Sequence, residues 1–255
     1  MDTSERRFED EIEYSLTHFG ASEFDLYEYR SPSGYDRELG LYPQDLLDFV
    51  RETQPQEWAR LERIHGLKAG EKFCKRVARE LEQRGVVEVL RRGVEDLGRR
   101  FELVFFAPGS DLNEQLAEKY WANRMTVVRQ LRYSTRNENS VDTVLFVHGI
   151  PVVTLELKNP LTGQTYRDAI DQYKRSRSAS EDLFRLNRRA VVHFAVDTDE
   201  AWMTTKLAGM DTVFLPFNRG YKNGAGNPPV AGKYKTSYLW EDVLAKDSLL
   251  DILHR

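Results

Sequence analysis

The sequence predicts an α/β protein, and three patterns support this. Two runs rich in Val, Leu, Phe and Thr, VDTVLFV and PVVTLEL, flank the dipeptide His148-Gly149, which is typical of a β-hairpin. Apolar residues recur at helical spacing in SERRFEDEIEYSLTHFG, where Phe8, Ile12 and Leu16 define one face. The short apolar run RAVVHFAV is typical of a buried strand. The chain therefore contains both helical and strand patterns, as an α/β protein does.

The elements can be justified in chain order. The first helix covers residues 4–20, with Ser4 as its N-cap and Gly20 as its stop. Residues 43–99 show a helical pattern interrupted near GLKAG, and we expect an all-helical insertion there. A strand FELVFFA, a helix DLNEQLAEKYWANR and a strand MTVVRQLRY lead into the hairpin. After it come a helix in TYRDAIDQYKRSR, the strand RAVVHFAV, a Gly- and Pro-rich loop over 218–237, and an amphipathic helix in YLWEDVLAKDSLLDILHR.

Length and composition fit this organisation. The chain has 255 residues, 40% of them hydrophobic and 31% charged, which suffices for one large domain with an insertion. We expect a domain over residues 1–235 that contains the insertion at about 43–99. Residues 236–255 are expected to form a C-terminal helix that lacks a cap, which indicates a longer natural chain.

The cellular compartment is predicted from the cysteine content and from the lack of membrane-span and signal-peptide patterns. Cys74 is the only cysteine, so there is neither a disulfide framework nor a cysteine-based zinc site. No apolar run approaches the roughly 20 residues of a membrane span, and MDTSERRFEDE has no signal-peptide character. These features favour a soluble protein in the reducing cytoplasm, without a membrane partner.

Three charged side chains interrupt the apolar hairpin: Asp142, Glu156 and Lys158. A strand pairing centred on Gly149 sets Asp142 opposite Glu156, and alternation places Thr154, Glu156 and Lys158 on one face. Like charges about 4.5 to 5.5 Å apart are destabilising, so a cation is expected between them. Two carboxylates suit Mg²⁺, and a lysine beside a metal-bound water suits phosphodiester hydrolysis. The alternative is a surface hairpin whose polar face meets water.

Basic residues gather on both sides of the hairpin, although the net charge of −4 by itself argues against a dedicated nucleic-acid binder. Those before it are Arg124, Arg129, Arg132 and Arg136. Those after it are Arg167, Lys174, Arg175, Arg177, Arg185, Arg188 and Arg189. A phosphate backbone would lie along such segments, and we take Arg167, Lys174, Arg175 and Arg177 as candidate DNA contacts. The alternative for each residue is a solvated basic helix face.

The residues carry a resemblance to a known family. Asp142 followed by Glu156-Leu157-Lys158 resembles the PD-(D/E)XK nuclease motif. RQLRYS, VDTVLFVHGIPVVTLELKN, TGQTYRDAIDQYK, VVHFAVD and FLPFNRG resemble the N-terminal nuclease part of the restriction subunit of type I restriction-modification enzymes. The resemblance covers nearly the whole chain and is densest from about 120 to 220. It implies a restriction-endonuclease-like fold, a mixed central sheet flanked by helices.

The resemblance also implies roles for the residues that match the motif. Asp142 and Glu156 are expected to hold Mg²⁺ with the main-chain carbonyl of Leu157, and Lys158 is expected beside the attacking water. In the family an ATP-driven translocase follows the nuclease. Nothing in this sequence matches G-x-x-x-x-G-K-[ST], so we expect ATP to be bound outside these residues, in the full-length subunit.

Two further matches lie outside the hairpin. Glu9, in FEDEI, matches the acidic residue of the family's first helix, with Glu5 and Glu11 as alternatives. Gln172 matches the Gln of a Q-x-x-x-Y motif that follows the active site on a helix. Ser176 stands where the Tyr of that motif is expected, so this sequence departs from the pattern.

Three other candidates are interpreted as structural. Tyr173 is adjacent to Gln172 but fits a buried position on the apolar helix face. His148 fits turn chemistry, and His193, in an apolar strand, fits a core histidine.

The expected function is a metal-dependent endonuclease domain of a type I restriction complex. It would cut double-stranded DNA after translocation, with the modification and specificity subunits as partners. One alternative is a repair or junction-resolving nuclease of the same fold. Another is a non-catalytic DNA-binding or docking module, in which the insertion binds partner subunits. A divalent ion between Asp142 and Glu156 would separate the enzymes from the docking module.

Overall fold

A mixed seven-stranded sheet forms the centre of the computed structural model, which describes residues 3–20, 22–108 and 114–255. Its strands lie in the order β1-β4-β5-β6-β7-β8-β9. Their bounds are β1 (Glu28–Tyr29), β4 (Met125–Arg132), β5 (Ser140–Val147), β6 (Ile150–Leu157), β7 (Val192–Val196), β8 (Ala201–Thr204) and β9 (Leu215–Pro216). The pairs β1–β4 and β6–β7 are parallel and the others antiparallel. This confirms the predicted α/β class and is consistent with a restriction-endonuclease-like fold.

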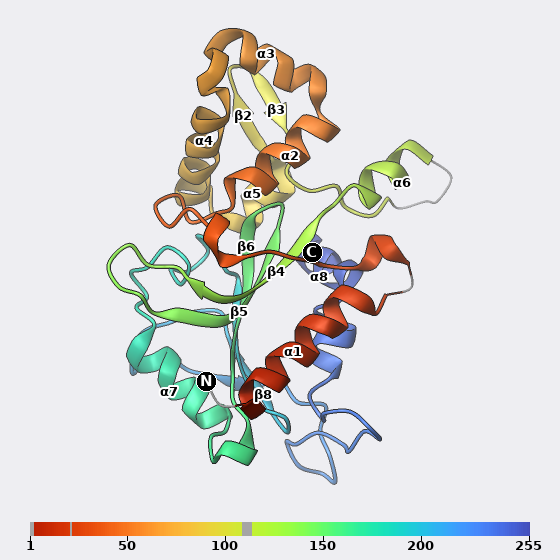
Figure 1. Ribbon diagram of the computed structural model, residues 1–255, viewed down its shortest axis with the longest axis vertical. Helices are drawn as coiled ribbons and strands as arrows, with labels where there is room; N and C mark the ends of the chain where they lie inside the picture. The colour runs from red at the N-terminus through yellow and green to blue at the C-terminus, as the bar shows by residue number, and fades with distance from the viewer. Residues whose placement is uncertain (1–2, 21, 109–113) are drawn as a thin grey trace.

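Helices flank the sheet and cap one end of it (Figure 1). The described α-helices are α1 (Thr3–His18), α2 (Pro43–Thr53), α3 (Pro55–His65), α4 (Ala69–Arg84), α5 (Val86–Arg92), α6 (Glu114–Trp121), α7 (Tyr166–Ser176) and α8 (Lys246–His254). The predicted insertion, α2 to α5, stands at one end of the sheet (Figure 1). Within the described ranges, no helix has the length and apolar character needed to cross a membrane.

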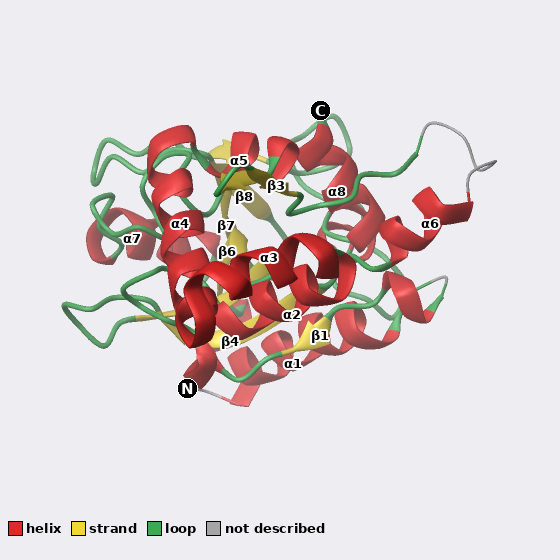
Figure 2. Ribbon diagram, turned by 90° about the horizontal axis from the view of Figure 1, so that it is seen from above, coloured by secondary structure: helices red, strands yellow, loops and turns green. Residues whose placement is uncertain are grey.

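Two hydrophobic cores lie on opposite faces of the sheet. Leu155 packs in a core that includes Phe8 of α1, whereas Val144 packs in a second core with Tyr173 of α7. Figure 2 shows α7 on one side of the strands and α8 on the other. Because neighbours in a strand point to opposite faces, Glu156 lies on the α7 side.

The hairpin has a two-residue turn at His148-Gly149. Both residues have positive φ, 48° and 79°, as a type I′ turn requires. A side chain at position 149 would meet the Tyr42 carbonyl oxygen at 2.3 Å, so only glycine fits. The ladder begins with Val147 opposite Ile150 and shifts register near the turn.

That register shift brings the charged end of the hairpin into the predicted alignment. Beyond the bulge, Leu145 pairs with Val153 and Thr143 pairs with Leu155. The extra residue on β6 is Val152. The pairing centred on Gly149 is therefore wrong at the turn and right beyond the bulge, because the bulge compensates for the shorter turn.

Three predicted segments differ from the structure. The insertion is not all-helical, because it ends in an antiparallel pair, β2 (Val94–Asp96) and β3 (Arg99–Phe101). Only the first residue of the predicted strand FELVFFA belongs to β3. The predicted C-terminal helix is divided into a π-helical turn (Leu239–Val243) and α8, because Ala245 has an extended ψ of 144°.

Candidate active site

Asp142 and Glu156 come from neighbouring strands and meet at the open end of the hairpin. Asp142 precedes Thr143, Glu156 follows Leu155, and these two neighbours are ladder partners. Oδ2 of Asp142 accepts the backbone N–H of Leu157 at 2.8 Å. The structure therefore brings the two predicted carboxylates together and ties the first to the strand that carries the second.

Glu156 is fully buried, and its surroundings disfavour its charge. Burial, followed by the negative charge of Asp142, raises the pKa of Glu156 to about 8, whereas Arg177 and Lys158 oppose that rise. Oε2 of Glu156 is buried without a hydrogen-bond partner among the described residues. Such an oxygen is costly to leave unpaired, and a cation would satisfy it.

Arg177 lies inside the protein and not on the surface where we expected a DNA contact. It follows α7 directly and is only 4% exposed. Its Nε donates to Oε1 of Glu156 at 2.6 Å, and its Nη2 donates to the carbonyl of Ser140 at 2.6 Å. Because an arginine stays charged in proteins, it favours the ionised form of Glu156 and limits the rise in the pKa of that group. The structure thus corrects the placement of Arg177.

Glu9 of α1 reaches the same site through Gln130 of β4. Glu9 is 2% exposed, and its Oε2 accepts a hydrogen bond from Arg129 Nε at 3.0 Å. Nε2 of Gln130 donates to Oε1 of Glu9 at 2.8 Å and to Oδ1 of Asp142 at 3.2 Å. Burial, followed by the Asp142 charge, raises the pKa of Glu9 to about 7. One amide therefore joins two of the predicted catalytic carboxylates.

Of the two alternatives to Glu9, the structure describes the side chain of Glu11. Glu11 lines a pocket together with Glu241 of the C-terminal segment, and burial followed by the negative charge of Glu241 raises the pKa of Glu11. The side chain of Glu5 is outside the described residues.

Lys158 continues β6 past the two carboxylates. Its backbone N–H donates to the carbonyl of Val196 on β7 at 2.9 Å. Its side chain is half-buried, and its charge lowers the pKa of Glu156. The ammonium therefore acts electrostatically on Glu156, and its place beside a metal-bound water stays a prediction.

The residues of the Q-x-x-x-Y region lie on different faces of α7 and differ in burial. Tyr173 is buried and shares a 2.8 Å hydrogen bond with Thr154, two residues before Glu156. Gln172 is half-buried beside it and makes no hydrogen bond to Asp142 or Glu156 within the described ranges. Ser176, at the position expected for Tyr, is exposed. Tyr173 is thus a core residue.

Both histidines singled out by the sequence are structural. His193 is fully buried, its Nδ1 lies 2.8 Å from the Thr154 hydroxyl, and burial lowers its pKa to about 3. The His148 ring stacks on Phe49 with centroids 3.5 Å apart. Neither contacts Asp142 or Glu156 in the part of the chain that the structure describes.

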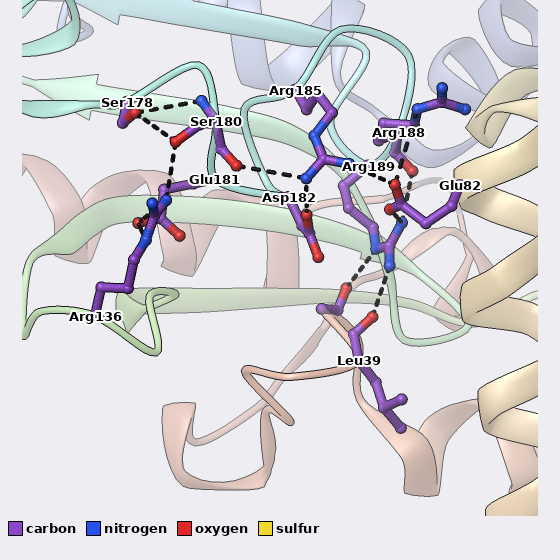
Figure 3. A network of polar contacts seen from close by, with 11 residues as sticks. Leu39, Glu82, Arg136, Ser178, Ser180, Glu181, Asp182, Arg185, Arg188 and Arg189 are labelled. Carbon is purple, nitrogen blue, oxygen red and sulfur yellow. Dashed lines mark hydrogen bonds and ion pairs between the residues drawn. The ribbon is translucent and has the colours of Figure 1, made fainter.

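Many of the basic residues near the hairpin are engaged in ion pairs. Glu82 of α4 accepts hydrogen bonds from Arg185 at 2.6 Å and from Arg189 at 3.1 Å, and Arg188 lies nearby (Figure 3). Arg189 also donates to the carbonyl of Leu39 at 2.7 Å (Figure 3). This cluster joins the loop after α7 to the helical insertion.

The basic residues before the hairpin are paired as well. Their partners are Glu52 for Arg124, Glu9, Asp10 and Glu13 for Arg129, Glu138 for Arg132, and Glu181 for Arg136. Arg167 and Arg175 of α7 are exposed and Lys174 is half-buried, and none of the three has an ion pair with a described residue. Among the basic residues named on either side of the hairpin, these three of α7 are therefore the ones available to a phosphate backbone in the described part of the chain.

The donor set fits a magnesium ion. Glu156 offers the unpartnered Oε2, Asp142 lies close enough to raise the Glu156 pKa, and Leu157 lies between Glu156 and Lys158. Across the described residues, no three side chains of His, Cys, Asp or Glu surround a common metal position. A site with two carboxylates suits Mg²⁺, which usually keeps several of its waters.

Two contacts of the site were missed from the sequence: the hydrogen bond of Gln130 to Asp142 and the ion pair of Arg177 with Glu156. A pattern in the sequence could have indicated each of them. Gln130 lies between Arg129 and Leu131, whose ladder partners flank Asp142, so aligning β4 with β5 would have found it. Arg177 follows Tyr173 by one helical turn, so it continues the face of α7 that packs on the sheet.

The fold and the site define a restriction-endonuclease-like α/β protein with paired carboxylates at a hairpin. The chain belongs to the family described as Type I restriction enzyme R protein N terminus, whose model matches residues 44–212. The match includes Asp142, Glu156, Lys158 and Gln172 and leaves Glu9 outside. A search of curated proteins gave no match. Membership places this chain among the N-terminal regions of restriction R proteins, which implies an endonuclease.

Proposed function

We propose that this chain is the metal-dependent endonuclease domain of a type I restriction R subunit, which hydrolyses phosphodiester bonds of double-stranded DNA. One observation carries the proposal. Asp142 and Glu156 meet on adjacent strands beside Lys158, and the buried Oε2 of Glu156 has no partner among the described residues. Paired carboxylates with a lysine two residues on are suited to metal-assisted attack on a phosphate.

Each residue then has a defined task. Asp142, Oε2 of Glu156 and the carbonyl of Leu157 would hold Mg²⁺. Bound there, Mg²⁺ would supply Lewis acidity and a more acidic water. Lys158 places a compact positive charge beside this position, where it stabilises negative charge that develops on the phosphate. Glu9, held on Gln130, orients Asp142 from the side of α1.

DNA and subunit contacts complete the proposal. Arg167, Lys174 and Arg175 of α7 would contact the phosphate backbone without reading its sequence, and Gln172 lies on the same helix. Modification and specificity subunits would recognise the target, and ATP would drive a motor region of the complete subunit.

The test uses the complete R subunit assembled with its modification and specificity subunits. Asp142→Asn and Lys158→Ala should each abolish DNA cleavage and leave ATP-driven translocation at the parental rate. Asp251→Asn serves as a control, because this carboxylate of α8 is exposed and pairs only with Arg255 among the described residues. Parental cleavage by either site variant would refute the assignment.

A further inference from the structure

We infer that Arg177 is a positioning residue of this site, which holds Oε1 of Glu156 so that Oε2 alone faces the metal. The inference rests on the proposed function and adds a residue to it. Arg177 lies outside the E-x-K spacing, and its role follows from the contacts of its guanidinium.

The guanidinium of Arg177 joins the two strands that carry the carboxylates. Its Nε binds Glu156 of β6 and its Nη2 binds the carbonyl of Ser140, the first residue of β5, each at 2.6 Å. The plane lies near the Tyr133 ring, with 5.9 Å between Cζ and the ring centroid. With 4% of its surface exposed, the side chain has little freedom to leave Glu156. Arg177 therefore fixes both the strand ends and the carboxylate.

The two oxygens of Glu156 are consequently different. Oε1 accepts a charge-assisted hydrogen bond, whereas Oε2 is buried and unpartnered in the described part of the chain. Rotation of the carboxylate would exchange them, and the Nε–H of Arg177 opposes that rotation. The guanidinium also offsets one negative charge in a place where Asp142 supplies another.

Lysine cannot replace arginine in this task. Arginine presents several donors in a rigid plane, so it can bind Glu156 and Ser140 at once. Lysine keeps the charge on a single flexible ammonium. Arg177→Lys therefore separates geometry from charge, and a positioning role predicts a loss in that variant.

The test measures Mn²⁺ binding to this chain by titration calorimetry. Arg177→Lys should bind Mn²⁺ about 10- to 100-fold more weakly than the parent, as expected when a residue that orients a metal ligand is changed. Arg189→Lys is the matched control, because Arg189 is 1% exposed and pairs with Glu82 at 3.1 Å (Figure 3). It should keep the parental affinity, with melting curves showing that both variants are folded.

The outcomes are distinguishable. If the parent binds no Mn²⁺, the proposed function fails. If the parent binds and Arg177→Lys binds equally well, or Arg189→Lys loses as much, only the inference about Arg177 is overturned. If Arg177→Lys does not fold, NMR of the parent decides: the protected Nε–H signal of Arg177 should persist when Mg²⁺ is added, and its loss would overturn the inference.

Discussion

Gln130 of β4 donates a hydrogen bond to Oδ1 of Asp142 on β5 at 3.2 Å, and does so from a left-handed backbone with φ of 50°. A non-glycine residue in a sparsely populated region costs on the order of 1–3 kcal/mol and persists where its surroundings fix it. Here Glu9 and Ser140 bind the other positions of the same amide, at 2.8 and 2.9 Å. Gln130 is therefore held in place between two carboxylates.

Gln130→Leu should lower the free energy of unfolding of the metal-free protein by about 1–3 kcal/mol, because the buried Glu9 loses a donor. Urea unfolding measures this. Gln44→Leu is the control, since that exposed amide donates to Asp48 at 2.7 Å and its loss should cost less than about 0.5 kcal/mol. Equal costs for the two variants would contradict the linking role of Gln130.

Asp142→Asn should leave the free energy of unfolding of the metal-free protein within about 1 kcal/mol of the parental value. Removing the charge relieves repulsion with Glu9 and Glu156, while the new amide offers Gln130 a poorer acceptor. Mg²⁺ should stabilise the parent and not the variant, because a ligand stabilises only the state that binds it. Equal stabilisation of both by millimolar Mg²⁺ would show that the ion binds elsewhere.

His193 should make stability depend on pH. Its pKa falls from an ordinary 6.5 to about 3, so below pH 6.5 the unfolded chain takes up a proton that the native state does not. Stability is therefore lost as the pH falls from 6.5 towards 3, by about 1.4 kcal/mol per unit for this group. His193→Gln should show a shallower loss in unfolding experiments between pH 6.5 and 4.5. The exposed His254, changed to Gln, should leave the slope as in the parent.

Weak, sequence-independent DNA binding should depend on the cations of α7. Changing Arg167, Lys174 and Arg175 together to Gln should reduce the slope of log affinity against log salt by about 0.9 for each phosphate that the variant no longer neutralises. Fluorescence titrations on unrelated duplexes at several salt concentrations measure it.

The control for α7 removes the same charge elsewhere. Lys75, Arg92 and Arg255 are exposed, and each pairs with a carboxylate four residues earlier in the chain. Changing these three to Gln should leave the salt slope unchanged. An equal reduction in both triple variants would mean that net charge, and not α7, determines DNA binding.

Local sequence patterns were sufficient to predict the hairpin and the positions of the charged residues on it. Alternation along β6 predicts that Glu156 shares a face with Thr154, and the turn dipeptide brings Asp142 opposite. The bulge at Val152 has no signal of its own in an apolar run, so the turn could be predicted only approximately. Strands β1 and β9 have two residues each, too few for a pattern.

The destinations of the basic residues could not be predicted from sequence. Arg177 and Arg189 lie in segments that also contain exposed basic residues, and no local pattern distinguishes them. Tertiary packing decides which arginines are buried against a carboxylate. Glu82 forms ion pairs with three arginines that follow it by about a hundred positions in the chain. Such pairings depend on how the insertion meets the sheet.

The most direct test of the metal site is a crystal structure of this chain with Mn²⁺, in which anomalous scattering locates the ion. We predict a peak within bonding distance of Oε2 of Glu156 and of the carboxylate of Asp142, with Arg177 still on Oε1. Ordered Mn²⁺ elsewhere in the crystal and none between Asp142 and Glu156 would contradict it.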